Sequence, residues 1–444
     1  MAENIAVYLK AFETFEQNGF SKDPFWLKQV RKQAMETFEH LGFPTMKDEA
    51  WKYTNVTSIA RTQFQLAGYP ANLGLDEIKP FLFGNPDWQR LVFINGNFSK
   101  DLSLIKKNGG LTLVRLSETL AKNPESVKPY LFQSDIKQNA FTALNAAFFH
   151  DGAFVHVAKN TILEEPIHLL FISTSSDRKA PLNQVRNLIV LEEHGKASVI
   201  EKHVCLGAGD HYLNNSVTEI ILKSGSDLSY HKLEHESERS SHIGTTQVNQ
   251  SADSKFSSSS ITIDGGLVRN DLNVILNGEH SECALNGFYL VSGSEHVDNH
   301  TLIDHPKPNG KSHQVYKGIL AGKSSGVFSG KILVHQDSQK TDASQINKNL
   351  LLSKEATMNT KPQLEILADD VKCTHGAAVG QLEEDAIFYL KTRGIDEQAA
   401  SRLLSYGFAS EVIDSIQIGP VREELGRIVR QKLEDCFAGS AYEK

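Results

Sequence analysis

The chain has 444 residues, of which 40% are hydrophobic and 23% are charged, and its formal net charge is −8. A chain of this length exceeds what one hydrophobic core supports, so we expect more than one structural unit, and the composition excludes a wholly disordered protein. The acidic balance, without any block of lysines and arginines, argues against a nucleic-acid-binding protein.

The first residues and the cysteines indicate the compartment. The segment 1–4 is polar and acidic, no signal-peptide apolar region follows it, and no run of 18 apolar residues occurs, so we expect a cytoplasmic protein without a membrane segment. The cysteines lack the paired spacing of zinc or redox motifs, so we expect no disulfide framework. They are Cys205, Cys283, Cys373 and Cys436.

The N-terminal region is predicted to be helical and then mixed α/β. Asp23 as N-cap and Pro24 as first helical residue are typical of a helix start. Apolar residues follow at helical spacing: Leu27, Val30, Ala34, Phe38 and Leu41. A short apolar run at 91–94, closed by an Asn-Gly pair, predicts a strand and turn, and a helix is expected from Leu116.

From about Phe154 to about Val379 the sequence consists of short β-branched runs separated by Gly, Asn, Asp and Ser. The runs 188–191, 261–263 and 272–276 predict strands. Similar turns, irregularly spaced, begin at Gly195, Gly225, Gly278 and Gly322. Short strands without crossover helices leave a pair of sandwiches, a propeller or a β-helix, and the single uninterrupted run favours the β-helix.

Three helices are predicted after Gly380. Glu383-Glu384-Asp385 opens the first, Asp396 caps the second and Pro420 starts the third. The second carries on one side Ala400, Leu403, Leu404 and Val412. The third carries near one stripe Val421, Leu425, Ile428, Leu433 and Cys436. Such a stripe predicts that the third helix packs against the second.

Two local motifs resemble parts of enzyme active sites, but neither matches the full pattern. The segment 318–324 resembles a phosphate-binding loop, but three residues separate its glycines instead of four, and it leads into a strand-like run. A phosphate-binding loop must lead into a helix, so we do not expect nucleotide binding. The serine run 257–260 lacks the Gly-x-Ser-x-Gly pattern of a hydrolase nucleophile and is interpreted as a solvated strand face.

Histidines and a cysteine suggest two metal sites. The first group is His296, His300, His305 and His313; the turns between them favour a polar surface over a fixed ligand geometry. The second is Cys373 with His375, which follow a strand-like run. Residues two apart in a strand project from the same face, so this thiol and imidazole could bind iron, zinc or copper, or accept sulfur as a thiolate. By spacing alone, a buried structural cysteine beside a hydrogen-bonded histidine is the more common case.

The stretch Asp369–Ala377 contains Cys373-Thr374-His375-Gly376. It resembles the SufD branch of the SufB/SufD family of the SUF iron-sulfur cluster assembly system. The resemblance continues through 388–395 and includes 340–366, Glu49–Thr54 and 141–152. SufB resembles SufD but often carries a cysteine-rich motif in its N-terminal half, where this chain has only Cys205.

The resemblance implies a fold and a set of partners. The fold is a right-handed parallel β-helix at 141–380, after a helical and mixed α/β region at 1–140 and before a helical domain at 381–444. The partners are SufB, which pairs through the β-helix edge, and the ABC ATPase SufC, which docks on the C-terminal helices. A homodimer through the same edge is expected for the isolated chain.

The implied function is that of a non-catalytic scaffold with a role in iron acquisition, in which the partner supplies ATP hydrolysis. His375 and Cys373 would bind iron or a nascent cluster shared with SufB, and His375 is favoured as the ligand. The alternatives are a SufB-type paralogue and a β-helical carbohydrate-active enzyme. The enzyme needs paired carboxylates along a groove, and the one marked acidic cluster, Glu383-Glu384-Asp385, resembles a helix start.

Overall fold

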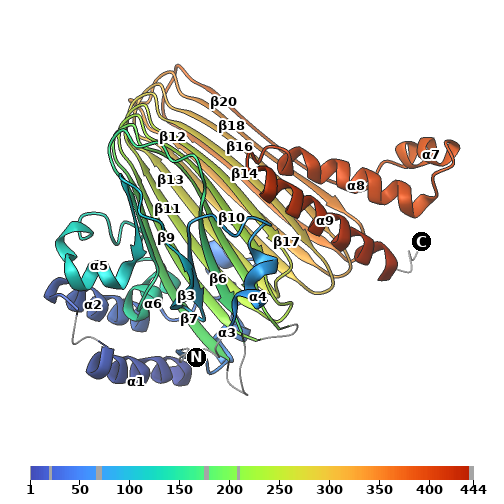
Figure 1. Ribbon diagram of the computed structural model, residues 1–444. Helices are drawn as coiled ribbons and strands as arrows, with labels where there is room; N and C mark the ends of the chain where they lie inside the picture. Colours follow the sequence, from blue (N-terminus) through green and yellow to red (C-terminus); the bar gives the residue numbers. More distant parts are fainter. Residues whose placement is uncertain (1, 20–22, 67–72, 175–179, 208–210, 440–444) are drawn as a thin grey trace.

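The computed structural model describes residues 2–19, 23–66, 73–174, 180–207 and 211–439. Its core is a parallel β-helix in which the chain alternates between two sheets that enclose one hydrophobic core (Figure 1). From β5 onward, each strand therefore pairs in parallel with the strand two positions along the chain. The predicted parallel β-helix, flanked by N-terminal and C-terminal helical regions, is confirmed.

The first sheet has the spatial order β19-β17-β15-β13-β11-β9-β7-β5-β4, with β1 (Gln65–Leu66) beside β7. Its strands are β4 (Leu111–Arg115), β5 (Ala153–Val157), β7 (Pro181–Leu191), β9 (Leu213–Leu222), β11 (Ser241–Gln250), β13 (Leu267–Leu276), β15 (His296–His305), β17 (Ser325–Val334) and β19 (Thr357–Ile366). All pairs along this path are parallel except β4 with β5. The predicted runs 188–191 and 272–276 lie within β7 and β13.

The second sheet has the order β20-β18-β16-β14-β12-β10-β8-β6-β2-β3. Its strands are β2 (Arg90–Ile94), β3 (Asn97–Leu104), β6 (Ile167–Ser173), β8 (Lys196–Cys205), β10 (Asp227–His235), β12 (Lys255–Ile263), β14 (Glu282–Val291), β16 (Lys311–Leu320), β18 (Asp342–Leu351) and β20 (Lys372–Gly380). The predicted strand at 91–94 is β2, which forms a hairpin with β3, and the run 261–263 ends β12.

The turns between strands stack on one another from one coil to the next. Gly225 and Gly322, at two of the predicted turns, have φ values of 70° and 64°, in the left-handed region that glycine adopts without a Cβ clash. At Gly278 the requirement is steric, because an added Cβ would overlap the backbone nitrogen of Ala252 in the turn one coil earlier. In the same contact, Asp253 N donates to Glu279 O at 3.0 Å.

A group of buried charged side chains lies between the sheets. Lys232 Nζ is 3.0 Å from Glu234 Oε1, and His242 Nδ1 is 2.7 Å from Glu236 Oε2. Although burial opposes it, the positive charges of Lys232 and His242 hold the pKa of Glu234 at about 2. His242 Nε2 on β11 also lies 3.3 Å from Glu234 Oε1 on β10. Since an unpaired buried charge costs several kcal/mol, this contact holds β10 of the second sheet against β11 of the first.

On the outer face of the second sheet, the first residues of successive strands alternate between positive and negative charge, and we call this row the charge ladder. The members are Lys196, Asp227, Lys255, Glu282, Lys311, Asp342 and Lys372, each opposite the next in register. The Glu282 carboxylate lies 3.1 Å from Lys255 Nζ and 3.4 Å from Lys311 Nζ. Opposite charges at directly paired positions are favourable, so this charge ladder supports the observed register.

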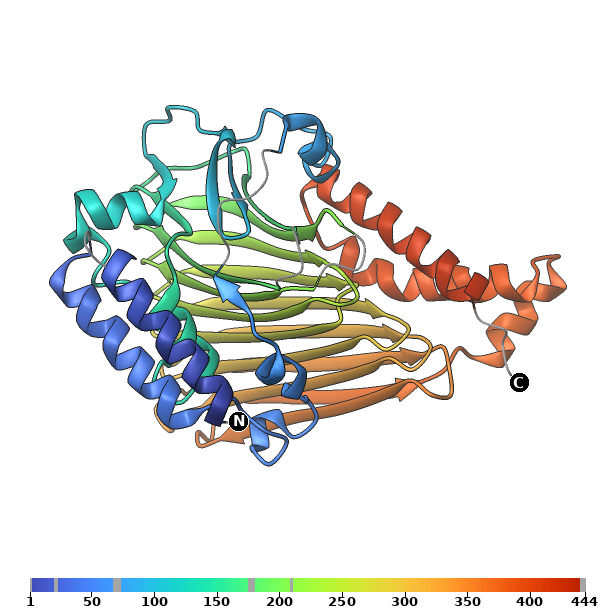
Figure 2. The ribbon, with the colours of Figure 1, turned by 90° about the horizontal axis from the view of Figure 1, so that it is seen from below.

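Most of the N-terminal region packs on the outer face of the first sheet (Figure 2). The segment 78–82 packs instead on the second sheet, where Ile78 and Leu82 cluster with Leu170 and Val204. Its helical elements are α1 (Ala2–Gly19), α2 (Phe25–Leu41), η2 (Glu49–Trp51), α3 (Thr57–Arg61), α4 (Leu75–Ile78), η3 (Lys79–Phe81), α5 (Leu116–Lys122), η4 (Pro124–Ser126) and α6 (Ala140–Phe148). The predicted helices are α2 and α5, but the predicted cap is wrong. Pro24 is the N-cap of α2, because the Asp23 carboxylate pairs with the buried Arg31 at 2.8 Å instead of capping.

The C-terminal region forms the three predicted helices, α7 (Glu384–Thr392), α8 (Glu397–Ile413) and α9 (Gly419–Gly439). Asp396 caps α8 by accepting from Ala399 N at 2.9 Å. The predicted stripe of α8 is wrong at Leu403, which is 53% exposed, whereas Ala400 and Ser401 in the preceding turn are fully buried. Leu403 therefore lies off the buried side of the helix. The stripe of α9 contacts α8, as predicted, and also the second sheet. Among the described helices, none is long and apolar enough to cross a lipid bilayer.

Replacing Gly278 with alanine should destabilise the protein, because the new methyl group would push apart two stacked turns. We expect the free energy of unfolding to fall by about 2 kcal/mol, the usual range for overpacking, measured as a shift of the urea unfolding midpoint. Gly109→Ala is the control, since its added Cβ meets nothing within 4 Å. Equal midpoints for the two variants would contradict the turn-stacking argument.

Candidate functional site

The β-helix ends on an open edge. In the described part of the chain, β19 hydrogen-bonds only to β17 and β20 only to β18, so the outer edge of each final strand is free. Apolar side chains are exposed here, including Leu367 at 55% and Val379 at 42%. A strand edge with unpaired backbone groups and apolar neighbours is a surface on which another β-structure can pair.

Cys373 and His375 both lie on β20, at this open edge. The register places Cys373 opposite the buried Ala343 and His375 opposite the buried Gln345. Ala343 and Gln345 belong to the preceding coil, on the inner side of β20. Cys373 is half-buried and packs against the main core, whereas His375 is exposed. The two side chains therefore lie on the same face of one strand, at the mouth of the solenoid.

The row that contains His375 continues inward as a pair of buried amides. Gln345 Nε2 donates to Gln314 Oε1 at 2.7 Å. The other amide atom, Gln345 Oε1, is buried and has no hydrogen-bond partner among the described residues. The residue paired with His375 on the inner strand therefore presents a polar acceptor. A buried acceptor without a hydrogen bond is costly. Sequence reasoning missed these glutamines, since only the register of the coils brings them beside His375.

The electrostatic surroundings keep Cys373 protonated. Burial raises the pKa of the Cys373 thiol above its ordinary value, and the negative charge of Asp342 raises it further. This direction is opposite to that needed for a free thiolate at neutral pH. Sulfur transfer to a preformed thiolate is therefore disfavoured in the isolated chain, and a metal ion would have to displace the thiol proton.

The pair supplies too few ligands for a closed metal site. Thiolate and imidazole are suitable donors for iron, zinc or copper. Across the residues that the structure describes, no group of three or more His, Cys, Asp or Glu side chains is arranged to hold a metal ion. Cys373 and His375 alone could therefore supply two donors, fewer than the four of a closed site.

The four histidines of the first predicted group do not come together. His296 bonds to Thr54 Oγ1 and Ser325 Oγ at 2.9 and 2.7 Å. His300 pairs with Asp298 at 3.0 Å. His305 is buried beside Ser312, and His313 is exposed beside Ser344 on the other sheet. The interpretation as a polar strand-and-turn surface is wrong for His305, which is fully buried.

A groove of about 440 Å³ lies where the first-sheet strands begin. A polysaccharide-cleaving enzyme needs two carboxylates on either side of the scissile bond. Among the described residues that line this groove, Glu238 is the only carboxylate. The groove therefore does not support the carbohydrate-active alternative, and Glu384 and Asp385 lie in the first turn of α7 instead.

A second exposed surface lies on α7, which follows β20 in the chain and projects away from the sheets in Figure 1. Every residue of α7 is exposed or half-buried, and Phe388 and Tyr389 are 68% and 58% exposed. Leu403 on α8 adds a third exposed apolar side chain. Adjacent exposed aromatic residues on a projecting helix are typical of a protein-docking surface.

Comparisons with known proteins point to one family. The family described as "SUF system FeS cluster assembly, SufBD core domain" matches residues 171–408, and "SufBD protein N-terminal region" matches residues 2–169. An iron-sulfur cluster assembly SufBD family protein of Synechocystis is 32% identical over 411 residues, 91% of this chain and 90% of the relative. The iron-sulfur cluster assembly protein SufD of Escherichia coli is 30% identical over 421 residues, 94% of this chain and 95% of the relative. The SufD of Bacillus subtilis is 26% identical over 442 residues, 96% of this chain and 97% of the relative.

Removing the charge of Asp342 should make Cys373 more reactive. In Asp342→Asn the pKa of the thiol falls, so alkylation of Cys373 by iodoacetamide at pH 8 should accelerate about twofold to threefold, as followed by peptide mass mapping. Glu365→Gln, on the neighbouring β19, removes a carboxylate of the same edge that pairs with Lys331 and should leave the rate unchanged. A rate unaffected by Asp342→Asn would show that burial alone controls the thiol.

Proposed function

The chain belongs to the SufBD family of SUF iron-sulfur cluster assembly proteins, and we propose that it is a SufD-type scaffold subunit. The observation that carries the proposal is the placement of Cys373 and His375 together at the open edge of the β-helix. The relatives named SufD, similar over nearly their whole length, support it. A SufB-type subunit is the second candidate; the presence of Cys205 as the only cysteine of the N-terminal half favours the first.

On this proposal SufB pairs with the open edge formed by β19 and β20. Strand pairing would satisfy the free backbone groups of both chains and cover the exposed apolar side chains Leu367 and Val379. Iron or the nascent cluster is the cargo of the complex. His375, with Cys373, would supply two ligands, and SufB would supply the others. The isolated chain would use the same edge to form a homodimer.

The ATPase SufC is proposed to dock on the C-terminal helical unit, 381–444. The exposed Phe388 and Tyr389 on α7 are suited to fill a pocket of that partner. Approach of two SufC subunits would then pull on the helices and open the shared edge, so that the ligands become accessible. The chain itself would act as a non-catalytic scaffold, with a role in iron acquisition.

We place this work in the cytoplasm. None of the four cysteines, all of which the structure describes, forms a disulfide, and Cys205, Cys373 and Cys436 are only half-buried. Half-buried thiols persist where the cell keeps cysteines reduced.

Replacing His375 with alanine should leave the fold and the complex intact and lower cluster formation. We expect the labile iron and sulfide bound to a co-expressed complex with SufB and SufC to fall about fivefold or more, because one of few ligands is lost. Iron and sulfide are measured after size-exclusion chromatography.

The matched control for this experiment is His313→Ala. His313 is also exposed, but it lies on β16 and bonds to Ser344 Oγ at 2.8 Å, so its removal should leave the iron content unchanged. Loss of the complex itself in His375→Ala would assign the residue to assembly. Failure of the wild-type chain to bind either partner would reject the proposed function.

Replacing Phe388 with aspartate should weaken SufC binding by about tenfold or more, since a central aromatic anchor becomes a charge in the interface. Affinity is measured by calorimetry with purified SufC. Phe25→Asp serves as control, because Phe25 is 75% exposed at the start of α2, away from the C-terminal helices. Unchanged affinity in Phe388→Asp would show that SufC does not dock on this part of α7.

A further inference from the structure

The C-terminal helices divide into a fixed part and a projecting part. We call α9 and residues 400–413 of α8 the base, and residues 384–399 the arm. Buried residues of the base include Ala409, Val412 and Val429, whereas α7 in the arm has only exposed or half-buried residues. Figure 1 shows the arm leading away from the sheet and the base lying across it.

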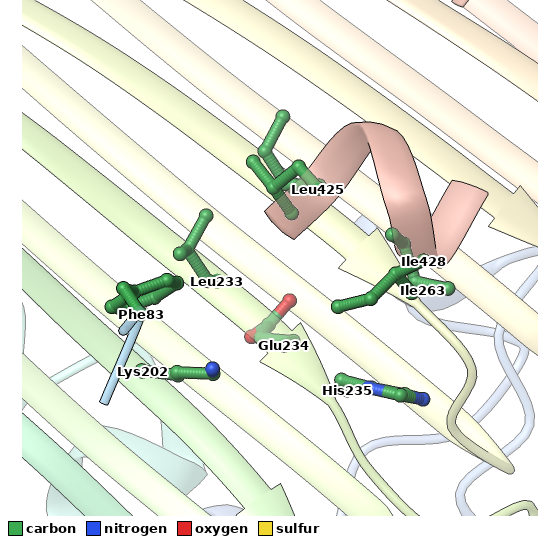
Figure 3. Close-up of a pocket in the computed structure, with 9 residues that line it drawn as sticks. Phe83, Lys202, Leu233, Glu234, His235, Ile263, Leu425 and Ile428 are labelled. Carbon is green, nitrogen blue, oxygen red and sulfur yellow. The ribbon is translucent and has the colours of Figure 1, made fainter. Parts of the chain in front are cut away.

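The base packs closely on the outer face of the second sheet. Leu425 and Ile428 of α9 face Leu233 and Ile263 of the strands beneath (Figure 3). The cavity that remains between them is about 10 Å³, room for about one water molecule. Lys432 adds an ion pair from α9 to Asp264, in the turn after β12. A helix held by apolar packing and an ion pair, without a gap, moves together with the sheet.

A buried lysine of the sheet connects the base to the strands near the open edge. Lys317 on β16 is 3% exposed, and its ammonium pairs with Glu411 of α8. The same Nζ donates to Phe408 O at 3.2 Å and lies 4.5 Å from the Phe408 ring. Lifting α8 would leave a buried ammonium without its carboxylate, which is strongly unfavourable, so this contact resists separation of helix and strand.

The position of Lys317 relates this contact to the proposed ligand pair. β16 pairs with β18, and β18 pairs with β20, which carries Cys373 and His375. Only one strand therefore separates β16 from the open edge. Lys348 on β18 lies opposite Lys317 in register and also acts on the Glu411 charge, so the carboxylate attracts both strands.

We propose that the Lys317–Glu411 ion pair is the point at which a load on the arm enters the second sheet and reaches the open edge. The inference rests on the proposed function, because the load would come from the docked ATPase. Lys317 and Glu411 are positioning residues: they bind no cargo, and they couple the movement of α8 to β16, β18 and β20. The apolar contacts of the base hold α8 against the sheet, and the Lys317–Glu411 ion pair adds a charged contact to one strand, β16.

The test uses the complex reconstituted from this chain, SufB and SufC, with thiol alkylation of Cys373 followed by peptide mass mapping, with and without ATP. In Glu411→Lys the new cation faces Lys317 and Lys348, so the ATP-dependent increase in Cys373 labelling should fall about threefold to tenfold, the range of coupling changes at such sites. Glu411→Gln, at a side chain that is 62% exposed, should give a smaller loss with no risk to folding.

The matched control is Lys331→Met, which removes the Lys331–Glu365 ion pair, 2.6 Å long, from the first sheet near the same open edge. It should leave ATP-dependent labelling at the wild-type level. Equal labelling in Glu411→Lys and wild type would overturn the inference, as would a wild-type complex whose labelling ignores ATP. Absence of any complex would instead reject the proposed function on which the inference rests.

Discussion

The constraint on which the rest of the structure depends is the parallel pairing of each strand with the strand one coil away. Such a ladder must begin and end somewhere, and the two ends of this protein differ. At the first end, the antiparallel strands β3 and β4 lie at the borders of the two sheets. At the other end, β19 and β20 leave their outer edges free. The candidate ligand residues lie on the end that is open, where a second chain can complete both the ladder and the coordination shell.

Features encoded by local pattern could be predicted from the sequence. The hairpin after Ile94, the cap at Asp396 and the long run of β-helical strands follow from turn residues and short apolar runs. The exposure of Leu403 could not be predicted, because the buried side of α8 carries the small or polar residues Ala400, Ser401 and Ser405, which an apolar pattern does not reveal. The cap at Asp23 failed because a buried arginine, Arg31, competes for the same carboxylate.

For the candidate site, the sequence predicts which two residues share a face of a strand, but not their surroundings. The charge that raises the pKa of Cys373 comes from Asp342, about thirty residues earlier. The amides behind His375 belong to the two preceding coils. Each neighbour depends on the number of residues in a coil, which varies along the chain and cannot be read from a single sequence. The same dependence hides the contact between Lys317 and Glu411.

The charge ladder of the second sheet has a consequence for how proteins of this shape change in length over evolution. Solenoids grow and shrink by duplication or loss of whole coils. Here the loss of one coil, for example that of Asp227, would bring Lys196 beside Lys255 and set two cations side by side. The loss or gain of two consecutive coils would preserve the alternation. Only changes by an even number of coils therefore keep the charges alternating. Related proteins that retain the charge ladder are expected to differ by even numbers of coils.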